Sequence, residues 1–232
     1  LKKKKGKDRK FEAMPEELVS HLDHFFADKA NLMGEEDNQH NLFLRYWLAR
    51  CCGLRRGEVI NARHNWIEQL PKGGFLLNIR HTDSYGDEFT ALPNWSPKSK
   101  AERSMGIPVW LAEYIRSNRR TAHPDEPLNH RNGYGKSLRN YDDLWSKCWS
   151  KALKSGGYDR EEYRNKYPRT THQLRGEYCT EIANERGLQI AATVAGHSSA
   201  ETTERYYFDR RKADSSFVFD PRTADDLREA VG

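Results

Sequence analysis

The chain has 232 residues, and 39 Lys and Arg against 34 Asp and Glu give it a formal net charge of +5 with neutral histidines. Six Trp, eleven Tyr and nine Phe, within a hydrophobic fraction of 36%, exclude a disordered chain. No run approaches the ~18 apolar residues of a membrane-spanning helix, and no apolar block of a signal peptide follows the lysine-rich start. We therefore expect a soluble, cytoplasmic protein of one large or two small domains, without a membrane partner.

The four cysteines do not follow a metal-binding or disulfide pattern. They include no C-x-x-C pair, and the two adjacent ones lie in an apolar helical run. We interpret all four as packing residues of a reducing compartment: Cys51, Cys52, Cys148 and Cys179. The sequence also contains no carboxylate cluster that could hold a metal ion, so we expect neither a metal nor another cofactor.

Residues 1–10 contain six Lys and one Arg and lack a hydrophobic group that could fold. We interpret them as a basic linker. Such a segment indicates either that an upstream domain precedes this sequence or that a basic tail contacts a polyanion.

Helical periodicity begins after Pro15, which is followed by two acids and by apolar residues at helical spacing up to Phe26. A second helix is predicted over 38–52. It is apolar nearly all round, as is typical of the centre of a helical bundle, and Gly53 is its expected C-cap. A short third helix is predicted over 54–62.

Between residues 64 and 109 short apolar runs replace the helical pattern, which predicts a small antiparallel sheet of about three strands. The expected strands are 75–79, 89–92 and 105–109, with Trp66 and Ile67 in a further short run. Helical patterns then return, and 159–169 is charged and irregular. The later helices are predicted at 110–121, 136–155, 171–186, 188–194, 200–207 and 223–231.

Four separated segments place polar residues beside helix ends and apolar runs, where a groove could gather them. They are C-G-L-R-R-G-E-V at 52–59, P-K-S-K-A-E-R at 97–103, T-H-Q-L-R at 171–175 and A-G-H-S-S-A-E-T-T-E-R-Y-Y at 195–207. Each motif alone is weak in so basic a chain, whereas their ordered combination is specific.

In order and spacing these segments resemble the tyrosine recombinases, the phage integrase family of DNA strand-exchange enzymes. The resemblance covers about residues 14–207, which corresponds to the catalytic domain of that family. Its G-L-R-x-x-E pattern implies Arg55 as the first catalytic arginine, with Glu58 as the partly buried acid beside it. Its H-x-x-R pattern implies His172 and Arg175 as further catalytic residues.

The last segment implies the remaining groups of the reaction. Its Gly-His pair is similar to the L-G-H of the family and implies His197, with Ala195 in place of the usual Leu. The tyrosine nine residues later, Tyr206, is the implied nucleophile, and we assign its neighbour Tyr207 to packing.

The lysine that protonates the leaving group is ambiguous. Resemblance to the K-T-K hairpins of the family favours Lys98, whereas counting eight residues back from Pro108 gives Lys100. We take Lys98 as catalytic. Lys100, Glu58 and Arg56 are then expected to contact DNA phosphate or to support the site structurally.

These residue types fit attack on a phosphodiester for physical reasons. The guanidiniums of Arg55 and Arg175 stay ionised and can bind the non-bridging oxygens as negative charge develops. A tyrosine hydroxyl, with a pKa of ~10, needs a base, for which His172 is favoured. His197 would donate to a phosphate oxygen, and a lysine would protonate the leaving 5′ oxygen.

Each residue also has a simpler interpretation. Arg55 and Arg56 could be solvated residues of a helix start, and His172 could cap the helix that follows Thr171. His197 could be a cap residue after Gly196, and the hairpin lysines could belong to a basic turn without a role in chemistry. His40, His123 and His130 are treated as residues without partners, and Trp145 and Trp149 as core.

The sequence therefore predicts a mainly α protein with a small antiparallel β-sheet, the fold of a tyrosine recombinase catalytic domain. The resemblance implies a linker at 1–10 from a missing N-terminal core-binding domain, a catalytic domain at 11–208 and a tail with a short helix at 209–232. It implies metal-independent, site-specific recombination through a 3′-phosphotyrosyl intermediate, by a tetramer on double-stranded DNA. Alternatives are a topoisomerase IB-like or telomere-resolving enzyme, and a non-catalytic DNA-binding module.

Overall fold

Helix α1 (Glu16–Ala27) begins directly after Pro15 and carries its two acids in the first turn, where they face the positive end of the helix dipole. Its apolar face buries Leu18, Leu22 and Phe26 completely. The computed structural model describes residues 11–81, 95–97, 102–123, 125–130, 138–159, 163, 166–167 and 170–197.

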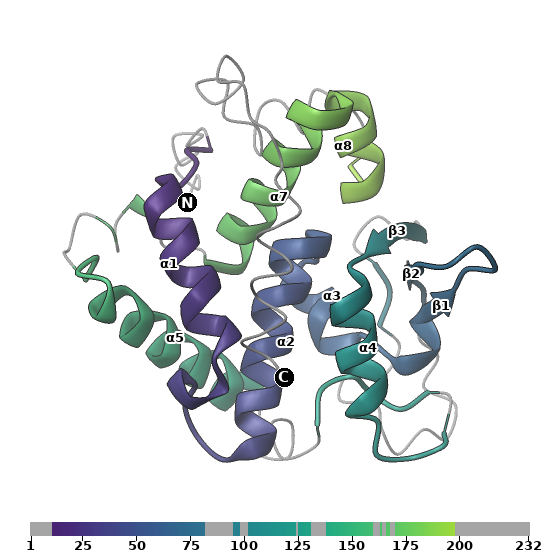
Figure 1. Ribbon diagram of the computed structural model, residues 1–232, viewed down its shortest axis with the longest axis horizontal. Helices are drawn as coiled ribbons and strands as arrows, with labels where there is room; N and C mark the ends of the chain where they lie inside the picture. The colour runs from purple at the N-terminus through teal and green to yellow at the C-terminus, as the bar shows by residue number, and fades with distance from the viewer. Residues whose placement is uncertain are drawn as a thin grey trace, which may run out of the picture.

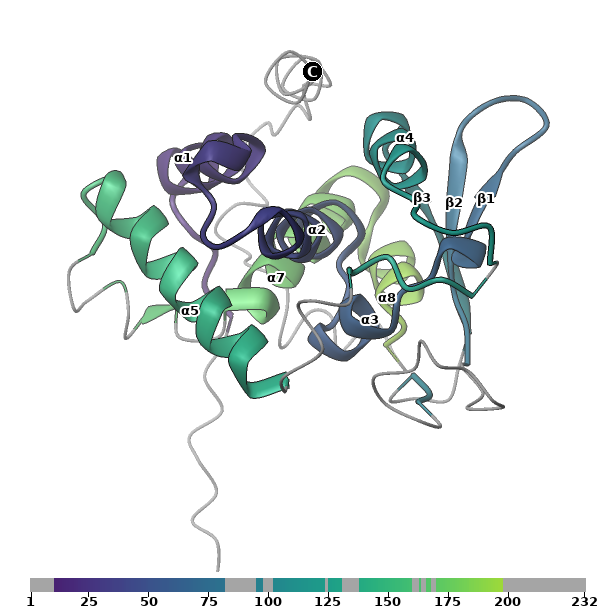
Figure 2. The same cartoon turned by 90° about the horizontal axis from the view of Figure 1, so that it is seen from below.

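Helix α2 (Glu36–Cys52) occupies the centre of the fold, with α1 on one side of it (Figures 1 and 2). Its side chains from Leu42 to Ala49 are all buried, because other elements cover it on every side. The helix ends at Cys52, and Gly53 is its C-cap as predicted, with the left-handed φ of 60° that such a cap needs.

The remaining helices follow the predicted order with shifted ends. The third helix is shorter than expected, because the backbone at Arg55 is extended and begins the helix only at the next residue. None of the described helices is long and apolar enough to cross a membrane. These helices are α3 (Arg56–Asn61), α4 (Val109–Ser117), α5 (Leu138–Ser155), α7 (Thr170–Arg186) and α8 (Leu188–Ala195).

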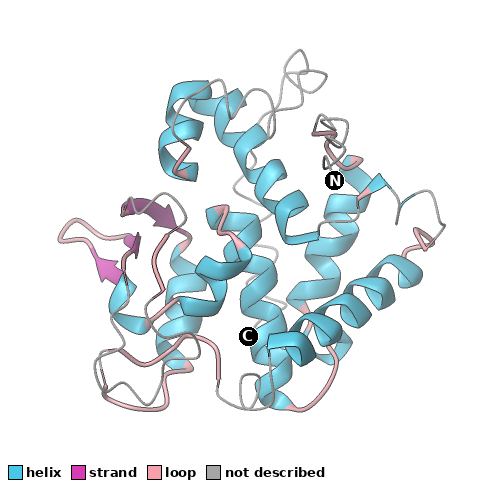
Figure 3. Ribbon diagram, turned by 180° about the vertical axis from the view of Figure 1, so that it is seen from behind, coloured by secondary structure: helices cyan, strands magenta, loops and turns pink. Residues whose placement is uncertain are grey.

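The sheet lies on one side of the helices (Figure 3) and has the antiparallel order β1-β2-β3. Its strands are β1 (Ile67–Gln69), β2 (Phe75–Ile79) and β3 (Arg103–Ile107). Pairing of Phe75 with Ile107 and of Leu77 with Met105 buries these side chains together. The last strand was expected to run to residue 109, but it stops before Pro108, the N-cap of α4. The strand expected at 89–92 lies outside the described residues.

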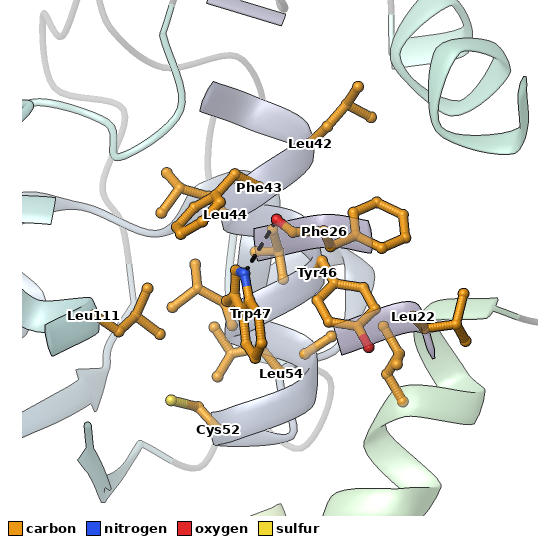
Figure 4. Close-up of a cluster of buried hydrophobic side chains, with 14 of the residues drawn as sticks. Leu22, Phe26, Leu42, Phe43, Leu44, Tyr46, Trp47, Cys52, Leu54 and Leu111 are labelled. Atoms are coloured by element: carbon orange, nitrogen blue, oxygen red, sulfur yellow. Dashed lines mark hydrogen bonds between the residues drawn. The ribbon is translucent and has the colours of Figure 1, made fainter. Parts of the chain in front are cut away.

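Leucine and aromatic side chains of α1, α2 and α4 pack together in the core (Figure 4), and tryptophans of α5 complete it. Phe26 stacks on Tyr46 with ring centroids 4.2 Å apart, and Trp47 packs edge-on against Trp110. The indole N–H of Trp47 donates to the Phe26 carbonyl over 3.4 Å. Trp145 and Trp149 are buried as predicted, and the four cysteines are free thiols, three of them buried.

Two histidines expected to have no partners are instead stacked in the interior. The rings of His40 and His130 lie 3.8 Å apart and nearly parallel. His40 bonds the Tyr114 hydroxyl through Nδ1 at 2.9 Å, and His130 approaches Asp37 at 3.3 Å. The expectation was wrong because the loop that carries His130 folds back onto α2, a contact between residues 90 positions apart in sequence.

The segment that precedes α1 lies against the first half of α7. The side chain of Gln173 donates to the Glu12 carbonyl over 2.7 Å, and the Met14 backbone N–H donates to Glu177 over 2.7 Å. Glu177 is 2% exposed, so this backbone group satisfies a buried carboxylate. The start of the described chain is therefore bonded to the helix that carries Arg175.

A glycine in α7 makes this close approach possible. A Cβ on Gly176 would lie 2.1 Å from the ring of Phe11, closer than any side chain tolerates. Only glycine at this position lets the Phe11 ring rest on the helix backbone, directly beside Arg175.

Candidate active site

Two helix C-termini meet where the predicted site residues gather. Gly53 is the C-cap of α2, and the C-cap of α8 is Gly196, which also has a left-handed φ of 64°. In each helix the last carbonyl groups lack intrahelical donors and carry the negative end of the helix dipole. Both helix ends therefore present carbonyl oxygens that attract a cation.

Arg175 of α7 supplies that cation. Its side chain is fully buried and donates to the Gly53 carbonyl at the end of α2 and to the Ala195 carbonyl at the end of α8. Its Nη2 also lies 3.0 Å from Nε2 of His197. Burial, followed by the nearby Arg55, lowers the pKa of Arg175, but a guanidinium remains charged in proteins.

Three successive carbonyls at the end of α8 each accept from a different arginine. Val194 accepts from Nε of Arg103 over 3.0 Å, and Gly196 accepts from Nη2 of Arg55 over 3.4 Å. The carbonyl between them belongs to Ala195, which Arg175 binds. The helix end thus aligns three guanidiniums that come from the start of α3, from β3 and from α7.

Glu58 of α3 lies on the other side of these guanidiniums and is 1% exposed. Its carboxylate accepts two bonds from Arg103, at 2.9 and 2.7 Å, and one from Nη1 of Arg55 at 3.0 Å. It also accepts from the Arg55 backbone N–H over 2.7 Å, which completes a capping box at the start of α3. Arg175 approaches it to 3.9 Å.

Burial alone would raise the pKa of Glu58, but bonds and charges from Arg103, the charge of Arg175 and the Arg55 backbone hold it below its ordinary value. Glu58 is therefore ionised. The cluster holds three guanidiniums and one carboxylate, which leaves a net charge of +2. We call Arg55, Glu58, Arg103 and Arg175 the arginine cluster; its excess positive charge fits a dianionic or oxyanionic group.

His197 adjoins the cluster as a neutral ring. Burial, followed by the charges of Arg175, Arg55 and Arg103, lowers the pKa of His197 to about 3. Arg175 has only N–H donors, so Nε2 of His197 must accept their hydrogen bond and the ring proton is on Nδ1. The backbone N–H of His197 caps α8 by donating to Ala192 over 2.9 Å. The backbone of His197 thus caps α8, while its side chain lies beside the arginine cluster.

The other predicted residues are distributed differently. His172 is in the first turn of α7, with an exposed side chain, one turn before Arg175 on the same helix. Arg56 is bonded to Asp142 of α5 at 2.9 and 2.5 Å, so its described contact joins two helices. Lys98, Lys100, Tyr206 and Tyr207 lie outside the described residues.

Arg103 is the member of the cluster that the motif analysis did not assign. It stands at the end of the P-K-S-K-A-E-R segment, where the lysines drew attention. An arginine at the first position of a strand carries no periodic signal of burial, and its partner Glu58 is 45 residues away. Among the described residues, no group of three His, Cys, Asp or Glu side chains could hold a metal ion.

Comparison with solved structures places the fold among recombinases. The site-specific recombinase XerH, solved with its difH substrate in a pre-cleavage complex, matches with a TM-score of 0.56 and 16% identity over 88% of this chain and 52% of XerH. The palindromic difH post-cleavage complex of XerH gives a TM-score of 0.58, 16% identity, and coverage of 95% and 54%. The Tn1549 transposon integrase in complex with transposon right end DNA gives 0.56, 19% identity, and coverage of 97% and 67%.

The chain spans about half the length of XerH. No family model and no curated protein sequence matches it. The described helices and the three-stranded sheet nevertheless reproduce the predicted architecture. The chain therefore has the mainly α fold, with a small antiparallel sheet, that is found in the catalytic domain of tyrosine recombinases.

Proposed function

We propose that this chain cuts and rejoins double-stranded DNA by transesterification, as a site-specific tyrosine recombinase. The observation that carries the proposal is the arginine cluster. A phosphodiester under attack gains negative charge on its non-bridging oxygens, and a buried site with a net charge of +2 stabilises that charge without reorganising. Arg55 and Arg175 are the residues that would bind these oxygens.

The covalent step uses Tyr206 as the nucleophile. Its hydroxyl oxygen attacks phosphorus while His172 takes the hydroxyl proton, and the bond from phosphorus to the 5′ oxygen breaks. Lys98, or Lys100 in its place, gives a proton to that oxygen as it leaves. The product is a 3′-phosphotyrosyl linkage, and attack by a 5′ hydroxyl reverses the step and rejoins the strand.

The neutral ring of His197 suits this site. A protonated histidine beside three guanidiniums would add to the repulsion, whereas a neutral ring still offers its Nδ1–H to a phosphate oxygen. The proposal needs no metal, because the arginines supply the charge that a metal would otherwise provide.

Partners and organisation are part of the same proposal. The XerH and Tn1549 integrase structures contain DNA. By analogy we propose DNA as the partner here, with four copies assembled on it in the cytoplasm. Residues 1–10 would lead from a DNA-clamping domain, and the tail at 209–232 would dock on a surface of its own or of a neighbouring copy.

The first test traps the covalent intermediate. Nicked duplexes with random flanking sequence are selected in repeated rounds for protein that stays attached after denaturation, and the modified peptide is mapped by mass spectrometry. We expect the adduct on Tyr206, its loss in Tyr206→Phe, and its retention in Tyr207→Phe. No adduct would favour the non-catalytic DNA-binding module, and relaxation of supercoiled DNA without partner exchange would favour the topoisomerase-like alternative.

The second test identifies the acid. With the selected duplex and excess chelator, Lys98→Ala should cleave poorly, and it should recover when sulfur replaces the 5′ bridging oxygen, since a thiolate leaves without a proton. Lys100→Ala should have a smaller effect. Recovery of Lys100→Ala alone would reverse the assignment, and cleavage that needs Mg²⁺ would contradict the metal-free step.

A further inference from the structure

The side chain of Arg103 is engaged at three points by protein groups. Both of its terminal nitrogens bond the Glu58 carboxylate, at 2.9 and 2.7 Å, and Nε bonds the Val194 carbonyl at 3.0 Å. The side chain is 7% exposed. This two-point contact is the strong form of an arginine–carboxylate pair, so Arg103 is fixed in orientation.

The other two arginines hold Glu58 less closely. Arg55 makes a single side-chain bond to it at 3.0 Å, and Arg175 remains at 3.9 Å. A carboxylate that is 1% exposed must have its charge compensated. Without Arg103, only Arg55 and Arg175 are left in the cluster to compensate it.

We propose that Arg103 is a positioning residue of the phosphate site, which occupies Glu58 so that the guanidinium of Arg55 keeps donors for phosphate oxygens and Arg175 keeps its bonds to the two helix ends. The inference rests on the proposed function, because it takes a phosphate group as the ligand. The guanidinium of Arg103 is itself bonded to Glu58 and Val194, so it affects phosphate binding through the other two arginines.

The charge balance of the cluster predicts how phosphate affinity should change in the variants. With Arg103 the cluster has a net charge of +2, and without it the charge is +1, with the free Glu58 oxygens competing for the same guanidiniums. Removing the charge of Glu58 as well returns the cluster to +2 and ends that competition. A double substitution should therefore restore what the single substitution loses, which a purely structural role of Arg103 does not predict.

The backbone at Gly196 is shaped around Arg103. A Cβ on Gly196 would lie 2.9 Å from Cδ and 3.1 Å from Nη1 of Arg103, and the left-handed φ there already disfavours a side chain. The glycine thus allows the guanidinium to pass the end of α8 and reach Glu58.

The test measures binding of inorganic phosphate to the DNA-free chain, at constant ionic strength, from the shifts of the His197 ring protons. Arg103→Gln should weaken phosphate binding about tenfold, which corresponds to about 1.4 kcal/mol. The double variant Arg103→Gln, Glu58→Gln should return within about threefold of the wild-type affinity. Arg103→Lys, which keeps the charge but not the two-point contact, should lose less than Arg103→Gln.

The control is Arg116→Gln, which removes the same charge from α4, where Arg116 contacts Gln69 of the sheet at 3.1 Å. It should bind phosphate like the wild type. Thermal melting verifies that every variant is folded. If Arg103→Gln does not fold, Arg103→Lys is compared with Arg103→Lys, Glu58→Gln, and the double variant should again bind phosphate more tightly.

The proposal is overturned if the double variant binds as weakly as Arg103→Gln, if Arg103→Lys loses as much as Arg103→Gln, or if the wild type shows no phosphate-dependent shift. Failure of the proposed reaction would appear separately, as a wild-type chain that binds phosphate but forms no adduct on Tyr206.

Discussion

Replacing Arg175 and Arg55 in turn should distinguish the contribution of the cluster to folding stability from its contribution to DNA cleavage. Arg175→Ala removes the donors to the Gly53 and Ala195 carbonyls, at the ends of α2 and α8. Each buried acceptor left without a partner costs about 1–3 kcal/mol, so the two together cost about 2–6 kcal/mol. That is a large part of the ~5–15 kcal/mol that stabilises a typical domain.

Arg55→Ala should reduce the free energy of unfolding much less than Arg175→Ala. The side chain is 19% exposed, its bond to the Gly196 carbonyl is 3.4 Å long, and Glu58 retains Arg103 and the backbone N–H of residue 55. We expect a loss of about 1 kcal/mol in the free energy of unfolding. Both variants should nevertheless lose cleavage by ~10²-fold or more, since each removes a preorganised donor to the phosphate.

Urea unfolding followed by tryptophan fluorescence measures the first quantity, because Trp47, Trp66 and Trp145 are buried and report on the core. The rate of adduct formation in a single turnover measures the loss of cleavage, without urea and under conditions in which each variant is folded. Arg175→Lys is the matched control, which keeps the charge but has a single donor nitrogen, and it should fall between the wild type and Arg175→Ala in stability. Equal losses of stability in Arg55→Ala and Arg175→Ala would refute the assignment of Arg175 as the residue that joins the two helix ends.

Two further predictions concern stability. Burial lowers the pKa of His40 to about 3 and that of His64 to about 4, from 6.5, so the unfolded chain binds protons that the folded chain does not. Stability in urea should fall as pH drops from ~6.5 to ~4, by ~1.4 kcal/mol per pH unit for each histidine, and a flat profile would contradict their neutral burial. Gly53→Ala should lower the melting temperature, because its Cβ would lie 2.3 Å from the Tyr178 ring and because its φ is left-handed. An unchanged melting temperature would contradict both the close contact and the strained backbone.

Local patterns predicted the elements that are determined locally. The apolar surround of α2 and the glycine after it were visible in the sequence, because burial on all sides and a left-handed cap each need particular residue types. Strand β1 was harder to predict. Its Ile-Glu-Gln sequence shows no alternation of apolar residues, and it is a strand because it pairs with β2.

Contacts between distant segments were the part that the sequence did not predict. Arg103 and Glu58 are each ordinary charged residues, and only the packing of β3 against α3 and α8 makes them a pair. The stacked rings of His40 and His130 depend in the same way on how a loop returns to α2. The resemblance implied Arg55, Glu58, Arg175 and His197 as site residues, without showing that the end of α8 binds the arginines.

The bonds between the segment before α1 and the first half of α7 couple two parts of the chain that are far apart in sequence. Glu177 loses its backbone donor if Met14 leaves, and the Phe11 ring rests on the backbone of Gly176, the neighbour of Arg175. Displacing this segment would therefore uncover a carboxylate and loosen the helix turn that presents the guanidinium. A displacement of the chain at residue 11 would therefore be transmitted to Arg175 through one residue of α7, so this junction helps to hold the arginine cluster in place.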